Sequence, residues 1–394
     1  MAKADPPHLR VTRLQLSNWR NFKAVDIELA NRVFVVGANA SGKSNLLDSV
    51  RFLGGLTRDG GGLQQAVKER GGVSSLRALV ARQNPRIEIK VALGSLDNES
   101  SKWHYELGFT HDPKRGGRPV VTHERVINPS GEKILSRPDG LDDQDPERLA
   151  QTALEQVIAN REFREIYGFA REIRYLHIVP QLVREPDRSV GRTNDPFGGD
   201  FLKQIAETNG RTREARLRRI TQALQVAVPQ LEELVLEPDR SDNAWHLKGR
   251  YAHWRKQGAW QTEAAFSDGT LRLLGLLWSL LDGQGPILLE EPELSLHPEV
   301  VSRMPQMLNR VQRGVRTRRQ ILLSTHSAAL LADPGIGLDE VLLLVPGQEG
   351  TTVRPASDFD EIALLLDGGL TMGDAVLPTT APDRAPQLAL FPAP

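Results

Sequence analysis

The sequence predicts an α/β fold with a central, mostly parallel sheet, and three observations support this prediction. Apolar residues 33–36 are typical of a buried strand, and a glycine-containing turn leads from them into a helical stretch at 45–53. Between 268 and 326 the apolar runs are long and continuous, as in parallel strands that are covered on both faces. Leu9–Gln15 and Ala24–Leu29 alternate apolar and polar residues, which indicates half-buried antiparallel strands at the N-terminus.

Composition excludes several classes of protein. The 394 residues give room for two or three compact units. Cysteine is absent, which excludes disulfides and thiol chemistry. No run approaches the ~20 apolar residues of a membrane span, and residues 1–7 do not resemble a signal peptide, so we expect no membrane partner and a cytoplasmic location. The net charge is zero, so any contact with nucleic acid must depend on local basic patches.

The first functional motif is Gly37–Ser44, which fits the phosphate-binding pattern G-x-x-x-x-G-K-[ST]. A strand, a glycine loop and a helix in this order point several backbone N–H groups at one spot, as a triphosphate requires. We expect Lys43 to lie against the β- and γ-phosphates of ATP and the Ser44 hydroxyl to hold Mg²⁺. The other expected nucleotide contacts are Gly37, Asn39, Ala40, Ser41, Gly42 and Asn45. The alternative is a glycine-rich turn with a chance lysine.

Two buried strands end in residues suited to catalysis. Pro286–Glu293 is an apolar strand that ends in acids, and the carboxyl edge of such a sheet is where ligands bind. We expect Glu290 to hold the Mg²⁺ shell and Glu291 to polarise or deprotonate the attacking water. Ile321–Thr325 is followed by His326, which could contact the γ-phosphate. The alternatives are an ordinary acidic turn and a structural histidine.

A third motif is the capped helix that begins at Phe266–Arg272. Ser267 or Asp268 is a suitable N-cap, and leucines at helical spacing follow. A helix N-terminus with serine and Gly269 also suits a phosphate, although every soluble protein has ordinary N-caps.

Taken in order, these motifs resemble an ABC-type ATPase head of the RecF/SMC class of P-loop NTPases. In texture the chain is most similar to small stand-alone bacterial ATPases, which are often described simply as AAA-family ATPases. The resemblance covers roughly the first 55 residues and about 240–350. It implies that Leu16–Phe22 is the N-terminal turn in which Arg20 approaches the nucleotide, and that Ser295–Pro298 is the dimer-contacting D-loop. It also implies ATP hydrolysis by a homodimer, or a higher even oligomer, in which Ser267 and Gly269 donate to the partner's γ-phosphate.

Two features depart from that family's pattern. Its first acid is usually Asp, whereas this chain has Glu290. The family's glutamine loop has no clear counterpart, and we assign no role to Gln64, Gln65 or Gln83.

The predicted organisation is an ATPase head that is interrupted by a compact insertion. The head comprises 1–55 and 241–376, the inserted lobe 56–240, and a disordered tail 377–394. Within the lobe we expect strands over 86–136 and helices over 146–235, with helices at Glu147–Arg171, Asp200–Val226 and from Gln230 onward. The insertion has no sustained heptads, which excludes long coiled-coil arms, and the stretch after His326 is too short for a TOPRIM nuclease domain.

Basic runs and the tail suggest macromolecular partners. Dense arginines occur at Arg211–Arg219 and Arg310–Arg319, and Arg250, Arg255 and Lys256 are interleaved with Tyr251, Trp254 and Trp260. These runs suggest DNA, although charge runs on helices are often only solvated faces. Gln387–Phe391 resembles the short peptide with which bacterial proteins bind the replicative sliding clamp.

Three functions therefore stay open. The first is an ATP-hydrolysing, dimerising head in DNA metabolism, repair or anti-phage defence. The second is a nucleotide-gated module that controls a separately encoded effector with little DNA contact. The third is a P-loop kinase for a small molecule, which the motifs at Phe266–Arg272 and at His326 disfavour.

Overall fold

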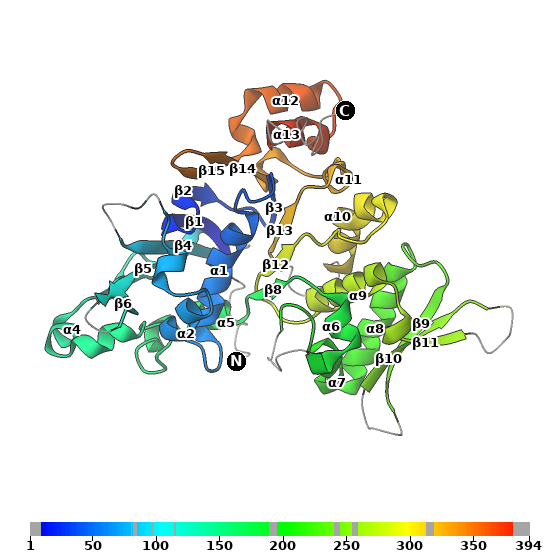
Figure 1. The fold of residues 1–394 in the computed structure, drawn as a ribbon, viewed down its shortest axis with the longest axis horizontal. Coiled ribbons are helices and arrows are strands. Elements are labelled where there is room, and N and C mark those ends of the chain that lie inside the picture. Colours follow the sequence, from blue (N-terminus) through cyan, green and yellow to red (C-terminus); the bar gives the residue numbers. More distant parts are fainter. Residues whose placement is uncertain are drawn as a thin grey trace, which may run out of the picture. The chain divides into compact units, whose positions relative to one another are not determined.

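The computed structural model describes residues 9–79, 81, 85–95, 98–113, 116–188, 195–239, 245–253, 259–312 and 319–380, except for the side chains of 98–101, 187, 311 and 312. The chain divides into two compact units (Figure 1). Unit 1 comprises 1–173, 320–328 and 334–394, and unit 2 comprises 174–319 and 329–333. The short helix α11 (Ala328–Leu331) runs across this division.

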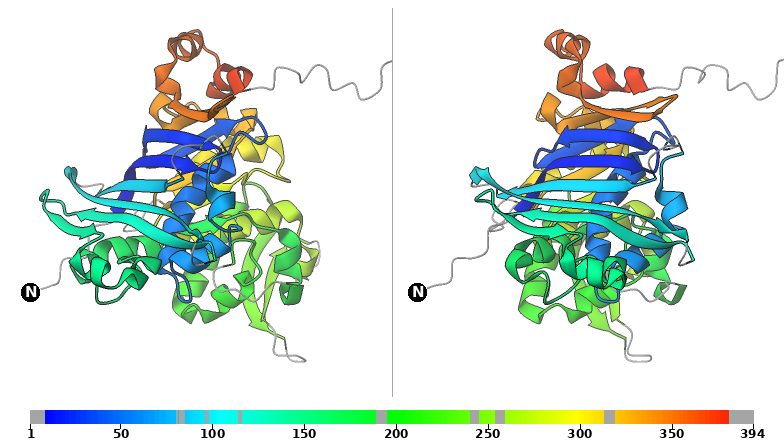
Figure 2. Two further views of the ribbon diagram at one scale, coloured as in Figure 1. Left: turned by 60° about the vertical axis from the view of Figure 1, so that its left-hand side comes forward. Right: turned by 90° about the vertical axis from the view of Figure 1, so that its left-hand side faces the viewer.

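The larger sheet of unit 1 has six antiparallel strands in the order β2-β1-β4-β5-β6-β7 (Figure 2). These strands are β1 (Leu9–Trp19), β2 (Phe22–Glu28), β4 (Ile87–Ser95), β5 (Asn98–Asp112), β6 (Arg118–Ile127) and β7 (Lys133–Arg137). In β2 buried Phe22, Val25 and Ile27 are separated by exposed residues, so one face of the strand packs inward.

The second sheet of unit 1 contains the strand that leads into the phosphate loop. Its order is β15-β14-β3-β13, with β3 (Arg32–Gly37) parallel to both β13 (Ile321–Thr325) and β14 (Val341–Gly347). The edge strand β15 (Gly350–Pro355) pairs with β14 in an antiparallel hairpin. Val33–Val36 are almost fully buried, as expected for a central parallel strand.

Helix α1 (Lys43–Thr57) lies between the two sheets of unit 1. Its Phe52 stacks on Phe109 of β5 and meets Trp19 of β1 edge-on, with ring centroids 5.6 and 5.4 Å apart. The same helix packs on β3 and β13. The phosphate loop is therefore fixed at the start of a helix that is packed on both sides.

The other helices of unit 1 are α2 (Leu63–Lys68), α3 (Val73–Leu76), α4 (Gly140–Gln144), α5 (Arg164–Arg171), α12 (Asp360–Asp367) and α13 (Met372–Thr380). Short 3₁₀ turns occupy Pro146–Ala150, Arg161–Phe163, Leu338–Glu340 and Ala356–Asp358.

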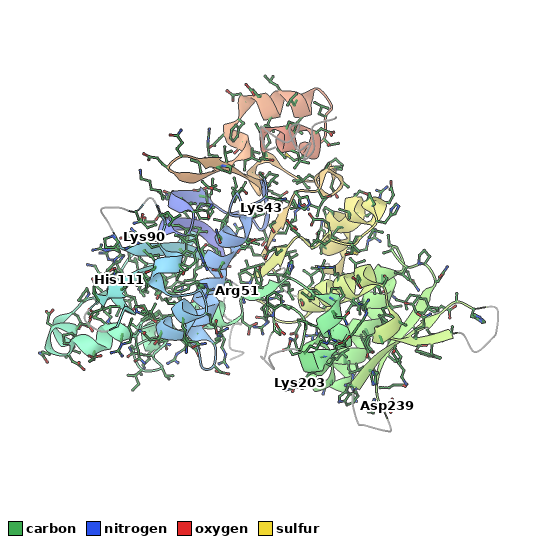
Figure 3. All side chains as sticks on the ribbon, in the orientation of Figure 1. Lys43, Arg51, Lys90, His111, Lys203 and Asp239 are labelled. Atoms are coloured by element: carbon green, nitrogen blue, oxygen red, sulfur yellow. The ribbon has the colours of Figure 1, made fainter. Side chains whose placement is uncertain are left out.

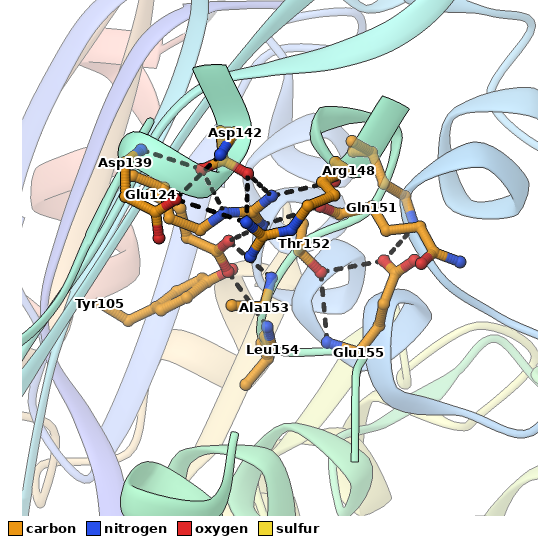
Figure 4. A network of polar contacts seen from close by, with 12 residues as sticks. Tyr105, Glu124, Asp139, Asp142, Arg148, Gln151, Thr152, Ala153, Leu154 and Glu155 are labelled. Atoms are coloured by element: carbon orange, nitrogen blue, oxygen red, sulfur yellow. Dashed lines mark hydrogen bonds and ion pairs between the residues drawn. The ribbon is translucent and has the colours of Figure 1, made fainter. Parts of the chain in front are cut away.

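A buried polar network fixes segment 137–155 to the six-stranded sheet (Figure 4). The Arg137 guanidinium donates to Asp142 at 2.8 and 3.0 Å and to Glu124 at 3.2 Å. Glu124 also accepts from the Tyr105 hydroxyl and from the backbone N–H groups of Ala153 and Leu154. Because the charges are paired and hydrogen-bonded, their burial is tolerated.

Unit 2 consists of helices packed around the apolar helix α9, with a small antiparallel sheet of order β11-β10-β9. The helices are α6 (Pro180–Arg184), α7 (Phe201–Glu207), α8 (Gly210–Leu224), α9 (Asp268–Leu281) and α10 (Pro298–Gln312), with 3₁₀ turns at Pro186–Arg188 and Glu263–Ala265. The strands are β8 (Arg174–Leu176), β9 (Leu231–Pro238), β10 (Trp245–Tyr251), β11 (Ala259–Thr262) and β12 (Ile287–Glu290). Strand β12 pairs in parallel with β8.

The α/β fold, the parallel pairing of the apolar strands and the antiparallel N-terminal strands are confirmed. Other expectations need correction. Strands within 86–136 do not form a separate lobe, because β4 pairs directly with β1 and extends its sheet. Glu147–Arg171 is not one helix, because only Arg164–Arg171 is α-helical, and the expected helix from Gln230 onward is strand β9. Helix α13 extends to Thr380, inside the expected tail, whose remainder (381–394) lies outside the described residues.

Among the residues that the structure describes, no helix has the length and apolar character needed to span a membrane.

Candidate functional site

The phosphate loop of unit 1 has the backbone geometry that the motif predicts. Ala40 and Gly42 have φ of 63° and 103°, and a Cβ on Gly42 would lie 2.2 Å from the Asn21 amide nitrogen. Gly37 is equally confined, because its Cβ would lie 2.5 Å from the Ser41 hydroxyl. Glycine is therefore required at both ends of the loop for reasons of space.

The polar groups of the loop are chemically suited to an anion. Lys43 is the first residue of α1 (Figure 3). Its ammonium is almost buried and donates to the carbonyl oxygens of Gly37 and Ala38 at 2.9 and 3.1 Å. The Ser41 hydroxyl is buried and has no hydrogen-bond partner among the described residues. Asn39, Ala40 and Ser44 are exposed at the surface of the loop. The loop thus offers hydrogen-bond donors and the Lys43 cation, and its backbone leaves no room for side chains at the two glycines. This combination fits a phosphate group with Mg²⁺.

Asn21 is the loop contact that the motif search missed. It lies in the turn between β1 and β2, and its amide nitrogen donates to the Ser41 carbonyl at 2.8 Å. Asn45, predicted as a nucleotide contact, uses its amide to donate to Asn21 Oδ1 at 2.8 Å. Only its position within the predicted turn Leu16–Phe22, next to Arg20, distinguished Asn21 in the sequence.

Arg20 makes contacts on the α1 side of the same turn. With φ of 53°, its backbone N–H donates to Leu76 O at 2.6 Å. Its guanidinium donates to Ser75 O at 3.2 Å and lies 3.9 Å from the Asp48 carboxylate of α1. Burial lowers the pKa of Arg20, and Asp48 partly offsets this shift. A role for Arg20 at the nucleotide stays a prediction.

His326 lies beside the phosphate loop in unit 1. Strand β13 is parallel to β3 with Thr325 opposite Val36, so His326 leaves its strand where β3 reaches Gly37. Ser324 and Thr325 are fully buried, and the Ser327 N–H donates to the Thr325 hydroxyl at 3.0 Å. The His326 side chain is exposed. The pairing therefore brings together two motifs that are almost 290 residues apart in the sequence.

The acidic motif belongs to unit 2. Glu290 is the last residue of β12, and its carboxylate accepts a hydrogen bond from the Tyr175 hydroxyl of the neighbouring β8. Glu291 follows with φ of 41°, an unusual backbone conformation for a residue with a side chain. Both glutamates are partly exposed, and Glu290 also lines a small hollow with Arg272, Leu276 and Pro292.

The motif Phe266–Arg272, which we call the signature turn, is also in unit 2, at the start of α9. The Ser267 hydroxyl caps the helix by accepting from the Thr270 N–H at 3.2 Å, and the Ser267 and Asp268 side chains are exposed. Arg184 of α6 holds the turn by donating to Phe266 O and to the Asp268 carboxylate, both at 2.7 Å. Gly269 is buried, and a Cβ there would lie 2.8 Å from Ser295 O in the predicted D-loop.

The predicted basic patches are largely engaged within unit 2. Arg213 stacks on Trp245, Arg216 pairs with Asp282 at 2.8 Å, and Arg250 pairs with Glu232 and Glu233. The expectation that Arg319 belongs to a DNA-binding patch is wrong. Its side chain is 1% exposed and donates to Gly285 O at 2.6 Å, so it is unsuited to DNA. Exposed members include Arg211, Arg218 and Arg310, whereas 313–318, Trp254, Arg255 and Lys256 lie outside the described residues.

The family model described as "AAA domain, putative AbiEii toxin, Type IV TA system" matches residues 32–332. The chain belongs to this AAA family. No curated protein matches it.

Several solved structures that resemble this AAA-family chain are SMC heads. One is the SMC head bound to the C-terminal winged-helix domain of ScpA, with a TM-score of 0.55 and 15% identity, over 87% of this chain and 97% of that one. Another is the head with an extended coiled coil, bound to the C-terminal domain of ScpA, from Pyrococcus furiosus; the TM-score is 0.52 and the identity 14%, over 91% and 100% of the two chains. These likenesses show that the chain has the fold of an SMC head.

Proposed function

We propose that this AAA-family head binds ATP with Mg²⁺ and hydrolyses it to ADP and phosphate. The observation that supports this proposal most directly is the register of β3 and β13, which sets His326 beside the phosphate loop. Two sequence motifs that are weak individually thereby meet at one sheet edge, where ligands of open α/β folds bind.

Each residue has a proposed role. Backbone N–H groups of 37–45 and the Lys43 ammonium bind the phosphates, and Ser44 and Glu290 hold the cation. Bound Mg²⁺ would neutralise negative charge on the phosphate oxygens. Glu291 accepts a proton from the attacking water, and His326 donates to the terminal phosphate. The Tyr175 hydroxyl limits the freedom of the Glu290 carboxylate, which is one methylene longer than the aspartate usual in the class.

We further propose that the active form is a dimer, or a higher even oligomer, in which Ser267 and Gly269 of one subunit donate to the nucleotide of the other. The Ser267 and Asp268 side chains are exposed, and Arg184 holds the Asp268 carboxylate, which supports this arrangement. A preorganised donor of this kind typically contributes 10²–10³-fold in rate.

The test is ATP hydrolysis as a function of protein concentration. We expect turnover per subunit to fall when the protein is diluted below its dimerisation constant. Glu291→Gln should bind ATP and accumulate dimers by analytical ultracentrifugation, while hydrolysis falls about 100-fold or more. Turnover per subunit that stays constant on dilution to the monomer would exclude the shared-site mechanism.

For the biological process we propose DNA metabolism, repair or anti-phage defence in the cytoplasm. The family description, which reads "putative AbiEii toxin, Type IV TA system", favours defence. Exposed Arg211 and Arg218 on α8 would contribute phosphate contacts, whose affinity falls steeply with salt. Fluorescence anisotropy with single-stranded and duplex DNA, with and without ATP, tests this proposal through the salt dependence and the nucleotide dependence of binding.

One observation favours the second candidate, a nucleotide-gated module that controls a separate effector. Arg213, Arg216 and Arg250 already have partners within unit 2, which leaves less free positive charge for DNA. ATP-dependent capture of a protein encoded beside this one, without salt-dependent DNA binding, would support this candidate over the first.

A further inference from the structure

Asn21 connects four segments of unit 1 that meet behind the phosphate loop. Its amide nitrogen donates to Ser41 O at 2.8 Å and to the Thr351 hydroxyl of β15 at 2.7 Å. Its amide oxygen accepts from the Asn45 side chain of α1 at 2.8 Å. The residue itself lies in the β1–β2 turn.

We propose that Asn21 is a positioning residue for phosphate binding, which acts by fixing the orientation of the peptide between Ser41 and Gly42. The inference rests on the proposed function, because it assigns a task within ATP binding. Asn21 does not need to touch the nucleotide for this task.

The argument begins with the geometry of a trans peptide, in which the C=O and the N–H point in opposite directions. Because the Ser41 carbonyl is directed at Asn21, the Gly42 N–H is directed to the other side, toward the interior of the loop. A rotation of this peptide would present a carbonyl oxygen to the phosphates instead of a donor. Gly42 has no side chain that would resist such a rotation, so an external hydrogen bond is needed.

Asn21 is itself held firmly enough to perform this task. The Thr351 N–H donates to Asn21 O at 2.9 Å, and a Cβ on Gly350 would lie 2.6 Å from the same oxygen. The Asn45 donor fixes which end of the Asn21 amide faces Ser41. Backbone and side chain are therefore both constrained by elements that also flank the loop.

The choice of an amide has a chemical reason. A carboxylate of the same shape offers no N–H to the Ser41 carbonyl and places a negative charge behind an anion site. An apolar side chain fills the space but leaves the carbonyl without this donor. Asn21→Asp therefore tests the hydrogen bond that orients the Ser41–Gly42 peptide separately from packing, because the two side chains are nearly identical in volume.

The experiment compares Asn21→Ala, Asn21→Asp and a matched control, Lys23→Ala. Lys23 pairs with Glu349 at 2.5 Å and joins the same two turns at the surface, and this exposed pair is separate from the hydrogen bonds that hold the phosphate loop. The readouts are Kd for a fluorescent ATP analogue with Mg²⁺, kcat at saturating ATP, and the unfolding temperature without nucleotide.

We expect Asn21→Ala to raise Kd about tenfold, because one hydrogen bond that orients a phosphate donor is lost. Asn21→Asp should raise Kd further, although it unfolds close to the wild-type temperature. Lys23→Ala should stay within about twofold in Kd, as expected for an exposed ion pair.

If the wild-type protein binds ATP and Asn21→Asp binds it with the same Kd, this inference is overturned while the proposed function stands. The same conclusion follows if Lys23→Ala weakens binding as much as the Asn21 variants. A wild-type protein that does not bind ATP would instead overturn the proposed function and the inference with it.

Discussion

The Tyr175 hydroxyl hydrogen-bonds to the carboxylate of Glu290, so a residue of β8 holds the acid that ends β12. Strand pairing places Tyr175 opposite Leu288, two residues before Glu290. The side chains are long enough to meet across this offset, and the contact defines one rotamer of a flexible glutamate.

Removal of this hydroxyl should impair metal-dependent turnover. We expect Tyr175→Phe to lower kcat about tenfold and to raise the Mg²⁺ concentration needed for half-maximal rate, because a hydrogen bond to a charged group is lost. Steady-state ATPase assays over a Mg²⁺ titration measure both effects. Tyr167→Phe on α5 is the matched control, and equal behaviour of the two variants would contradict a role for Tyr175.

Complementation between two inactive variants tests whether active sites are shared. Lys43→Ala and Ser267→Ala should each hydrolyse ATP slowly on their own. In a shared-site dimer, a mixed pair has one site with both residues intact, so an equal mixture should regain about a quarter of wild-type activity. A mixture no more active than its components would place Ser267 at the nucleotide of its own subunit, or at none.

Stability measurements test two structural features of the signature turn, the N-cap at Ser267 and the close packing of Gly269 on the predicted D-loop. Ser267→Ala should cost about 1 kcal/mol, because it removes an N-cap. Gly269→Ala should cost about 1–3 kcal/mol, because the new methyl group would meet the Ser295 carbonyl and Leu296 at 2.8 and 2.9 Å. Chemical denaturation checks both values. A Gly269→Ala protein as stable as wild type would show that the predicted D-loop moves aside at little cost in free energy.

The buried network of unit 1 predicts a pH-dependent variant. Burial raises the pKa of Glu124, whereas for Asp142 the hydrogen bond from Arg137 and further donors outweigh burial and lower the pKa. Asp142 therefore stabilises the wild-type fold above its unfolded pKa, and this contribution is lost as the pH falls through its folded pKa. Arg137→Met removes the hydrogen-bonded cation from both buried carboxylates and leaves only Arg148, 3.7 Å from Asp142; it should cost about 3–5 kcal/mol at pH 7.5.

In Arg137→Met the folded pKa of each carboxylate should exceed its unfolded value, so the variant gains stability as the pH falls. The difference from wild type should therefore be smaller at pH 5 than at pH 7.5 by urea denaturation. Arg148→Met, at the more exposed edge of the network, should cost less than about 1 kcal/mol. A pH-independent difference would contradict the ionic origin of the effect.

The tail peptide Gln387–Phe391 stays a prediction from sequence, outside the described residues. If it binds the sliding clamp, Leu390→Ala with Phe391→Ala should abolish capture of purified clamp protein by this chain. Binding should be weak, because the segment loses conformational entropy when it becomes ordered. Capture that survives both substitutions would remove the idea.

Local motifs could be predicted from sequence because their chemistry is local. The loop Gly37–Ser44 and the strands before Glu290 and His326 combine a short spacing with an apolar run, and both properties are visible in one chain. The family was predicted correctly from their order.

Long-range contacts could not be predicted in the same way. Asn21 meets Thr351 across 330 positions, and no local pattern indicates such a pair. The helix expected over Glu147–Arg171 fails because Glu124 and Arg137 bind backbone groups of 148–154, which competes with helical hydrogen bonds. The sequence predicts that strands 86–136 lie outside the head, because the pairing of β1 with β4 spans many residues. Such pairing depends on tertiary context.

The position of β3 has a consequence for biosynthesis. Both neighbours of this strand, β13 and β14, are translated about 280 residues or more after it. Until the ribosome has produced them, β3 exposes two unsatisfied edges that can pair with other nascent chains. The sheet that carries the phosphate loop can therefore form only late in synthesis.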